Sequence, residues 1–152
     1  MSETTAPVTT AASAASVTAA PAAGRARAAR IALRTLTVLL ALFYGVASAL
    51  PKLIAHPSAV EAFDTIGWGS APMYIIGALE LAGGIALLVP VLSGVAPIAL
   101  SALMAGAFVV QMSYFDGENA ATPLILIVPL ALLAWTRRRS NADLVRLVKR
   151  RA

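Results

Sequence analysis

Four apolar runs, each nearly free of charged residues, constrain this chain more than any other feature. They cover Ile31–Leu53, Ala71–Val89, Val91–Phe115 and Ala121–Thr136. A helix needs about 20 apolar residues to span a bilayer, within a range of roughly 17–25. The first three runs are long enough, and the fourth is short but has usable flanking residues. The pattern predicts an all-α fold: an integral membrane four-helix bundle with four spans.

The composition supports this assignment and argues against nucleic-acid binding. Hydrophobic residues make up 59% of the chain and charged residues 12%, whereas soluble domains average about 45–50% and about 25%. The net charge is +5, but every basic residue except Lys52 lies in one of two blocks, 25–34 and 137–151. Basic blocks beside apolar runs mark the cytoplasmic side of a membrane protein. Since four spans return the chain to its starting side, both termini are expected in the cytoplasm.

The regions outside the spans have distinct compositions. Residues 1–24 are almost entirely Ala, Thr, Ser, Val and Pro without periodicity, which predicts a disordered leader. The membrane domain is expected over 31–136, and 137–152 forms a basic cytoplasmic tail. Within that tail, Asn141–Arg151 has the pattern of an amphipathic helix, which we expect to rest on anionic lipid.

A cleaved signal peptide is the competing interpretation of the first run. The arginine-rich flank, the apolar stretch and Ala47-Ser48-Ala49 resemble a signal sequence with its cleavage site. The apolar region is long for such a sequence, and cleavage would leave Lys52 stranded near a new terminus. We therefore expect the first run to remain as a span.

The connection after the first run has a helical pattern of its own. Ser58-Ala59-Val60-Glu61 fits a capping box, and the helix that follows is expected to end at Gly67. Its apolar residues share one face, which predicts a short amphipathic helix on the outer membrane interface, with Trp68 as an anchor.

Cysteine and histidine are too scarce to form the usual redox or metal sites. The chain has no cysteine and one histidine, His56. Structural disulfides, CxxC chemistry and thiolate metal ligands are therefore excluded, and no metal site is expected.

Glu80 is the residue that most suggests a function. It lies nine residues into the second span, about 13 Å deep at 1.5 Å per residue. An unpaired charge at that depth costs at least about 2.5–3.5 kcal/mol, so Glu80 should be protonated, paired or in contact with water. Gly77 and Gly84 share its helical face, and small residues mark close helix approach. We therefore expect Glu80 to face the inside of the bundle.

Other polar side chains in the spans could meet it. Tyr44, Ser48 and Lys52 follow at intervals of four in the first span and share one face. Gln111 is the one strongly polar side chain of the third span. We predict that these four residues and Glu80 line one cavity open to the outer side. Whether Lys52 reaches inward or extends outward to the interface is left open, as is a purely structural Glu80 hydrogen-bonded to Tyr44 or Gln111.

Two segments of the chain carry a family resemblance. Ala49-Leu50-Pro51-Lys52-Leu53 and the glycine-flanked acid of 76–84 resemble the DoxX-like family of small four-span bacterial membrane proteins. In that family the first span ends in G-x-x-K-L and the second contains G-x-x-E-x-x-G-G. Ala49 stands where the family often has glycine, and its side chain leaves less room for another helix to approach there.

The resemblance implies a location in the bacterial inner membrane as a multi-pass protein, and it suggests functions without deciding between them. Some relatives look like small subunits of quinone-linked thiosulfate oxidation, which implies an accessory subunit of a membrane redox complex, with a quinone or a lipid head group in the polar cavity and no catalysis of its own. The expected partners are then the lipid bilayer and an oxidoreductase, and a homo-oligomer is left open. The alternatives are a small proton-coupled transporter, with Glu80 as proton carrier, and a ligand-free structural protein.

Overall fold

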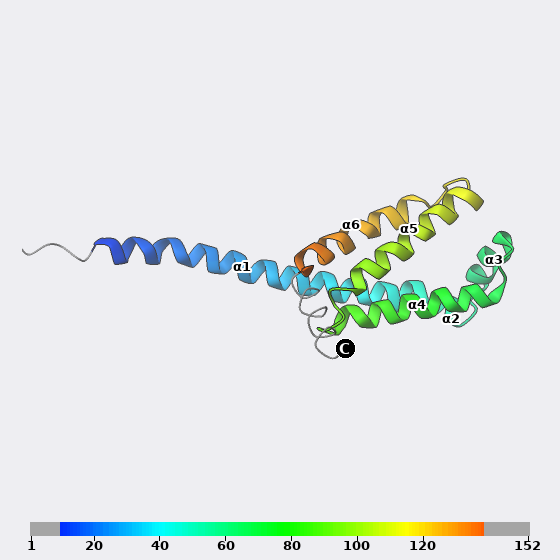
Figure 1. Cartoon of the computed structure of the whole chain (residues 1–152), viewed down its shortest axis with the longest axis horizontal. Coiled ribbons are helices and arrows are strands. Elements are labelled where there is room, and N and C mark those ends of the chain that lie inside the picture. The colour runs from blue at the N-terminus through cyan, green and yellow to red at the C-terminus, as the bar shows by residue number, and fades with distance from the viewer. Residues whose placement is uncertain (1–9, 139–152) are drawn as a thin grey trace, which may run out of the picture. The chain divides into compact units, whose positions relative to one another are not determined.

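The computed structural model describes residues 10–138, with side chains from residue 23 onward. Every regular element in this range is helical (Figure 1). The chain divides into two compact units, Met1–Thr35 and Leu36–Ala152, and the features discussed below lie in the second. In chain order the elements are α1 (Thr10–Leu42), the π-helix η1 (Phe43–Ala49), α2 (Leu50–Leu53), α3 (Pro57–Ile66), α4 (Ser70–Leu88), α5 (Ala96–Tyr114) and α6 (Ala121–Thr136).

Within the described residues, three helices are long and apolar enough to cross a membrane. They are Ala23–Leu53, Ser70–Leu88 and Ala96–Tyr114. The fourth predicted span is present as α6, which is equally apolar but only 16 residues long. The prediction of an all-α protein with several membrane-length apolar helices is therefore confirmed for the first three runs, and the fourth run forms a shorter helix.

Large apolar side chains cover the outside of these helices. Val128 is 69% exposed on α6, and Val109 and Ile75 are 60% exposed on α5 and α4. Soluble proteins rarely expose apolar surface on this scale, whereas a lipid environment makes it favourable. The small interior contains Tyr44 and Met73, together with leucines from α4, α5 and α6.

Helices pack mainly in two pairs in this unit. One face of α4 packs against η1 and α2, and α5 packs against α6, as Figure 1 shows. Glycine permits the first contact, because a Cβ on Gly84 would lie 3.0 Å from the Ala41 carbonyl oxygen, and one on Gly77 would lie 2.9 Å from the Lys52 Cβ. The prediction that these two glycines mark a close approach is confirmed.

Two boundaries differ from those expected. Helix α1 begins at Thr10, inside the segment 1–24 for which the sequence predicts no regular structure; the high helix propensity of alanine accounts for this. Helix α3 begins at Pro57 with His56 as its N-cap, so Ser58 lies inside the helix and does not cap it. The expected end of α3 is confirmed, since Gly67 adopts a left-handed conformation with φ 76°. The amphipathic tail 141–151 lies outside the described residues.

Arg137 ties three segments together at one end of the second unit. Its guanidinium donates to the Thr37 hydroxyl at 2.8 Å and to the carbonyl oxygens of Leu87 and Ser93 at 3.4 and 3.3 Å. It therefore caps the C-terminal end of α4, where a cation is favoured by the helix dipole. Burial lowers the pKa of Arg137, yet an arginine remains protonated. The sequence marks this residue only as part of a basic flank.

Candidate functional site

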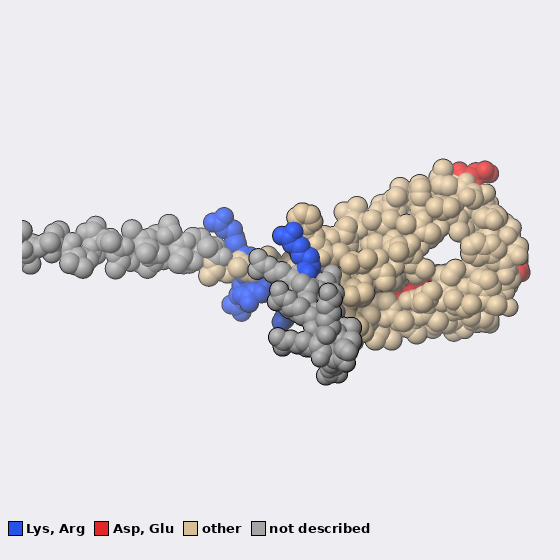
Figure 2. Space-filling model, viewed as in Figure 1, with Lys and Arg blue, Asp and Glu red and all other residues tan. Residues whose placement is uncertain are grey.

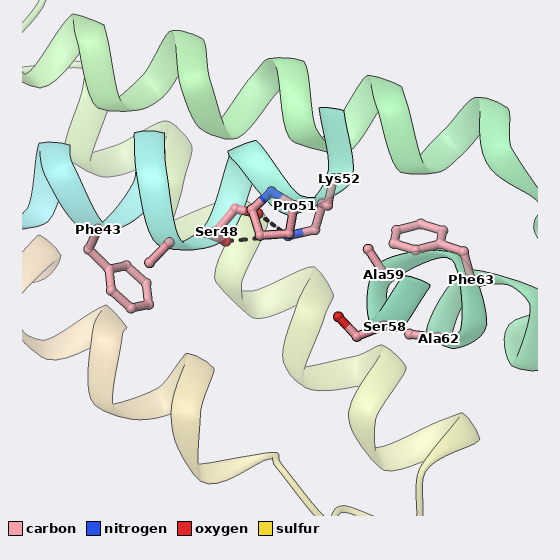
Figure 3. Close-up of a pocket in the computed structure, with 9 residues that line it drawn as sticks. Phe43, Ser48, Pro51, Lys52, Ser58, Ala59, Ala62 and Phe63 are labelled. Atoms are coloured by element: carbon pink, nitrogen blue, oxygen red, sulfur yellow. Dashed lines mark hydrogen bonds between the residues drawn. The ribbon is translucent and has the colours of Figure 1, made fainter. Parts of the chain in front are cut away.

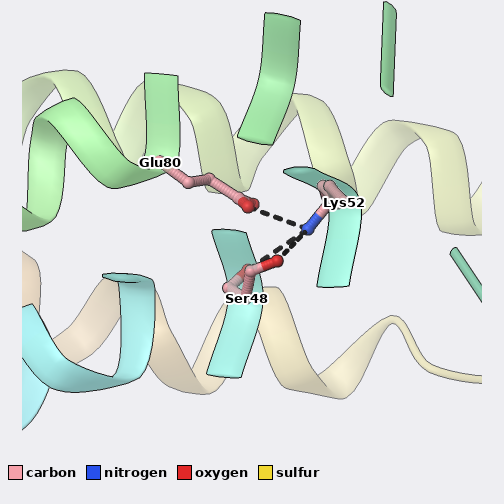
Figure 4. A network of polar contacts seen from close by, with 3 residues as sticks. All are labelled: Ser48, Lys52 and Glu80. Atoms are coloured by element: carbon pink, nitrogen blue, oxygen red, sulfur yellow. Dashed lines mark hydrogen bonds and ion pairs between the residues drawn. The ribbon is translucent and has the colours of Figure 1, made fainter. Parts of the chain in front are cut away.

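A buried ion pair joins the end of the first span to the middle of α4. Lys52 Nζ lies 2.8 Å from Glu80 Oε2, and the same ammonium donates to the carbonyl oxygen of Ser48 at 2.9 Å and to its hydroxyl at 3.3 Å. Figure 4 shows the three side chains converging on the lysine nitrogen. The alternative in which Lys52 extends outward to the interface is not what the structure shows.

The backbone explains why these side chains meet. Glu80 lies on the face of α4 that carries Gly77. Because Gly77 has no side chain, α2 can approach α4 so closely that a Cβ on Gly77 would lie 2.9 Å from the Cβ of Lys52. Ser48 precedes Lys52 by four residues, so the two lie on one side of the helix. The side chain of Glu80 is 4% exposed and that of Lys52 is 20% exposed. The carboxylate is therefore enclosed, whereas part of the Lys52 side chain remains exposed.

A pocket of about 340 Å³ opens on the exposed side of Lys52. Figure 3 shows its lining side chains, which come from η1 and α2 on one side and from α3 on the other. Polar groups are few, and aromatic and small apolar side chains form the rest of the wall. The lining residues are Phe43, Ala47, Ser48, Pro51, Lys52, Ser58, Ala59, Ala62 and Phe63.

Tyr44 and Gln111 take no part in this pocket. Tyr44 is fully enclosed, and Phe43 packs edge-on against its ring with centroids 5.6 Å apart. The Tyr44 hydroxyl and Gln111 Oε1 are buried atoms without a hydrogen-bond partner among the described residues. The predicted cavity of five polar residues is thus only partly assembled. Ser48, Lys52 and Glu80 are joined through the lysine nitrogen. Tyr44 lies within electrostatic range of Glu80, but neither Tyr44 nor Gln111 lines the pocket.

The sequence does not indicate the α3 side of the pocket. Ser58 and Phe63 both line it, and the Ser58 hydroxyl lies 2.9 Å from His56 Nδ1. The Ser58 amide also donates to Nδ1 at 3.4 Å, so this nitrogen acts as an acceptor and the hydroxyl donates to it. The apolar face of α3 is apparent in the sequence, but its pattern predicts the membrane interface as the partner of that face.

An aromatic cluster connects the pocket wall to the C-terminal end of α5. The ring of Phe63 lies 6.4 Å from that of Trp68, which in turn lies 6.4 Å from Tyr114. Trp68 is 42% exposed, as an interfacial tryptophan should be. Trp68 therefore contacts a pocket residue without lining the pocket itself, so its fluorescence can report changes in the pocket.

The described residues offer no independent metal centre. No group of three or more His, Cys, Asp or Glu side chains in the described range could hold a metal ion, and the sequence contains no cysteine. The chemistry of the site therefore consists of ion pairing and hydrogen bonding through one ammonium, one carboxylate and two hydroxyls.

Comparison with known proteins adds one finding. Residues 35–134, well over half of the chain, match the model of the DoxX-like family. The matched region contains η1, α2 to α5 and α6 up to residue 134, and with them the ion pair and every residue of the pocket. No curated protein and no solved structure matches the chain.

Proposed function

We propose, from the premise that this chain belongs to the DoxX-like family, that it is an accessory subunit of a membrane redox complex. In this proposal the pocket beside Lys52 holds the polar head of a quinone or of a lipid. The electron-transfer chemistry then belongs to a partner oxidoreductase in the same membrane, and this subunit binds and orients the ligand.

The observation that carries the proposal is the unequal exposure of the ion pair. Lys52 lines the pocket, while its counter-charge on Glu80 is enclosed. A ligand that replaces the 3.3 Å contact of the ammonium with the Ser48 hydroxyl would meet a hydrogen-bond donor whose charge is already balanced by Glu80. Such a donor suits a carbonyl oxygen or another acceptor atom, and it carries no unpaired charge when the pocket is empty.

The pocket also fits the shape of an amphiphilic head group. Ligand pockets typically enclose about 300–1,000 Å³ and combine apolar walls with a few polar groups; this pocket has about 340 Å³. Phe43 and Phe63 supply flat apolar surface, and Lys52 and Ser48 supply the polar end. A bound quinone would supply the redox-active ring, and these residues would bind its carbonyl oxygen and ring faces.

Access to the pocket region is supported by the surface view. Figure 2 shows an opening in the second unit between the α5–α6 pair and the side formed by α3 and α4. Arg137 and the connection at 89–95 hold the opposite end together. A ligand with an apolar tail could leave that tail among the lipids while its head occupies the pocket.

We further propose that α6 completes a four-span bundle with both termini in the cytoplasm. The basic residues after α6 support this orientation, as does the acidic connection from α5 to α6, which carries Asp116 and Glu118. Figure 2 shows acidic side chains at one end of the second unit. A helix of 16 residues falls just below the usual spanning range, so flanking residues or local bilayer thinning would complete the crossing.

Reporter fusions test this orientation. A fusion placed after Ala152 is expected to report the cytoplasm, because both basic flanks are retained there, and a fusion within Asp116–Asn119 is expected to report the outer side. Paired phosphatase and fluorescent-protein reporters measure the two positions independently. An outer location for the C-terminus would rule out the four-span arrangement.

A structural role is the second candidate, and the ion pair itself favours it. The Lys52–Glu80 contact joins α2 to α4 across the interior and would fasten the helices even without a ligand. The proton-coupled transporter receives less support, because Glu80 would have to break this pair in every cycle. The binding experiment below distinguishes ligand binding from a purely structural role.

Fluorescence of Trp68 provides the binding measurement. The chain has two tryptophans. Replacing Trp135 with phenylalanine leaves Trp68, which contacts the pocket wall, as the only tryptophan. We expect a short-chain quinone to quench it saturably in the purified full-length protein. Lys52→Met should weaken binding by about tenfold or more, the value of one charge-assisted hydrogen bond.

The controls separate the two ligands and the two candidate roles. Lys149→Met makes the same chemical change in the tail and should leave the affinity unchanged. A short-chain phosphatidylglycerol that displaces the quinone from the pocket would identify a lipid head group as a competing occupant. Quenching that does not saturate, or that Lys52→Met leaves unaltered, would contradict the proposal and leave the ion pair as a structural fastener.

A further inference from the structure

The first span changes its helical form at the point where it meets the site. Residues Phe43–Ala49 form a π-helix, and Pro51 follows within α2. Proline has no amide proton, and its ring collides with the carbonyl oxygen four residues earlier in an α-helix. A turn with i→i+5 bonding is wider and relieves that collision. Such π-helical turns are rare, and they occur frequently at functional sites.

The wider turn matches the first span to α4. Gly84 faces the backbone at Gly45 and the Cβ of Tyr44, and Gly77 faces Lys52. The two glycines are seven positions apart in the sequence, close to two α-helical turns. The backbone carbonyl oxygens that they face are eight positions apart: Ala41 O would lie 3.0 Å from a Cβ on Gly84, and Ala49 O 3.3 Å from a Cβ on Gly77. One additional residue must therefore be absorbed between the two contacts. The π-helical segment lies between them.

The same turn selects the side chains that face the pocket. From the first span the pocket receives Phe43, then Ala47 and Ser48, then Pro51 and Lys52. This spacing is between four and five residues per turn, as i→i+5 bonding requires. An α-helix starting from Phe43, with 3.6 residues per turn, would direct Leu50 to the third position instead of Lys52.

We propose that Pro51 and η1 form a positioning device that sets the register of Lys52, so that its ammonium reaches Glu80 and the pocket at once. Pro51 is a positioning residue here, since it acts through Lys52. If the π-helical turn reverted to an α-helical turn, everything beyond it would rotate by one residue, about 100°. Lys52 would then turn away from Glu80. The inference depends on the proposed function only for its consequences on ligand binding.

Restoring the amide proton tests this device. Pro51→Ala allows α-helical bonding to resume, and Lys52 is expected to lose its ion pair. The readout is the rate at which an amine-directed acylating reagent modifies Lys52 in the purified protein, followed by mass spectrometry with Lys149 as the internal reference. We expect the Lys52 rate to rise by about tenfold, since an ammonium held by an ion pair and a carbonyl is protected. Pro129→Ala is the matched control, because Pro129 lies inside α6 away from any π-helical turn, and it should leave the rate unchanged.

A compensating deletion makes the test specific to register. Removing Val46, an exposed residue of η1, from the Pro51→Ala variant leaves seven positions between the two carbonyl groups that face the glycines, those of Ala41 and Ala49. A continuous α-helix then satisfies both contacts with α4. The doubly altered protein is expected to return the Lys52 rate to within about twofold of the parent, a rescue that a merely structural proline would not allow.

The outcomes are separable. An unchanged Lys52 rate in Pro51→Ala, or a doubly altered protein that is unfolded or still reactive, overturns the proposal. If Pro51→Ala alone does not fold, recovery of a folded and protected protein by the deletion supports it equally well. Failure of the parent to bind a quinone would overturn the proposed function and leave the register inference intact, because acylation requires no ligand.

Discussion

Lys52→Met is expected to destabilise the protein by about 3–5 kcal/mol, the usual cost of leaving one member of a buried ion pair without its partner. The large effect follows from the burial of Glu80, which is 3% exposed and has Lys52 as its cation at 2.8 Å. Methionine preserves the length of the side chain but supplies no charge. The measurement is the free energy of unfolding in mixed detergent micelles, with helix content followed by circular dichroism.

Glu80→Gln completes a double-mutant cycle. The amide oxygen can still accept a hydrogen bond from Lys52, and the lysine, being 20% exposed, retains hydration from the pocket. This variant is therefore expected to fold and to lose less stability than Lys52→Met, while binding the quinone about tenfold more weakly because the ammonium is less firmly positioned. The double variant should be no less stable than Lys52→Met, since each loss already strands the other group. Additive losses of stability would show that the two charges do not interact. Normal quinone binding by Glu80→Gln would mean that the glutamate only holds the two helices together.

Gly84→Leu is expected to abolish the packing of α4 against the first span. A Cβ at this position would lie 3.0 Å from the carbonyl oxygen of Ala41 and 3.3 Å from the amide nitrogen of Gly45. Both are backbone atoms, which cannot move aside as a flexible side chain can. Overpacking commonly costs about 1–3 kcal/mol and more where the backbone must shift, so we expect a loss above about 3 kcal/mol and little folded protein in membrane extracts.

Gly106→Leu is the matched control for this substitution. Gly106 also lies inside a membrane-length helix, but a Cβ added there would have no neighbouring atom within 4 Å. Leucine there should be neutral or stabilising by up to about 1 kcal/mol, because it has the higher helix propensity. Size-exclusion profiles and unfolding measurements on both variants provide the comparison. Equal loss in the two variants would mean that bulk alone, and not the close approach at Gly84, is responsible.

The elements of this fold were largely predictable, for a physical reason. Apolar runs of spanning length must satisfy their backbone hydrogen bonds internally, and helices do so within one segment. The sequence therefore predicts α4, α5, α6 and the membrane part of the first helix directly. It also indicates that Glu80 faces inward, because Gly77 and Gly84 share its side of the helix. The helix over Thr10–Ala23 was missed, since local composition argues for disorder more readily than it argues for an alanine-rich helix.

The candidate site was predictable only in part. Intervals of four residues place Tyr44, Ser48 and Lys52 on one face of an ideal α-helix, and this reasoning correctly associates Ser48 with Lys52. It is only partly right for Tyr44, which lies within electrostatic range of Glu80 but does not line the pocket. Nothing in the spacing shows which side chains of α3 would approach, since α3 belongs to a connection and reaches the pocket only through tertiary packing.

The amino-acid sequence by itself determined that this chain forms apolar helices of membrane length, that one acid lies among them, and that glycines would bring its face against another helix. These properties depend on hydropathy and on 3.6-residue periodicity, which are local. Only the tertiary structure decided that Lys52 turns inward to Glu80, that a pocket forms beside it, and that Arg137 joins Thr37 to the end of α4. The ion pair and the Arg137 contacts link residues at least 28 positions apart in the sequence, a separation that no local pattern of hydropathy or periodicity can specify.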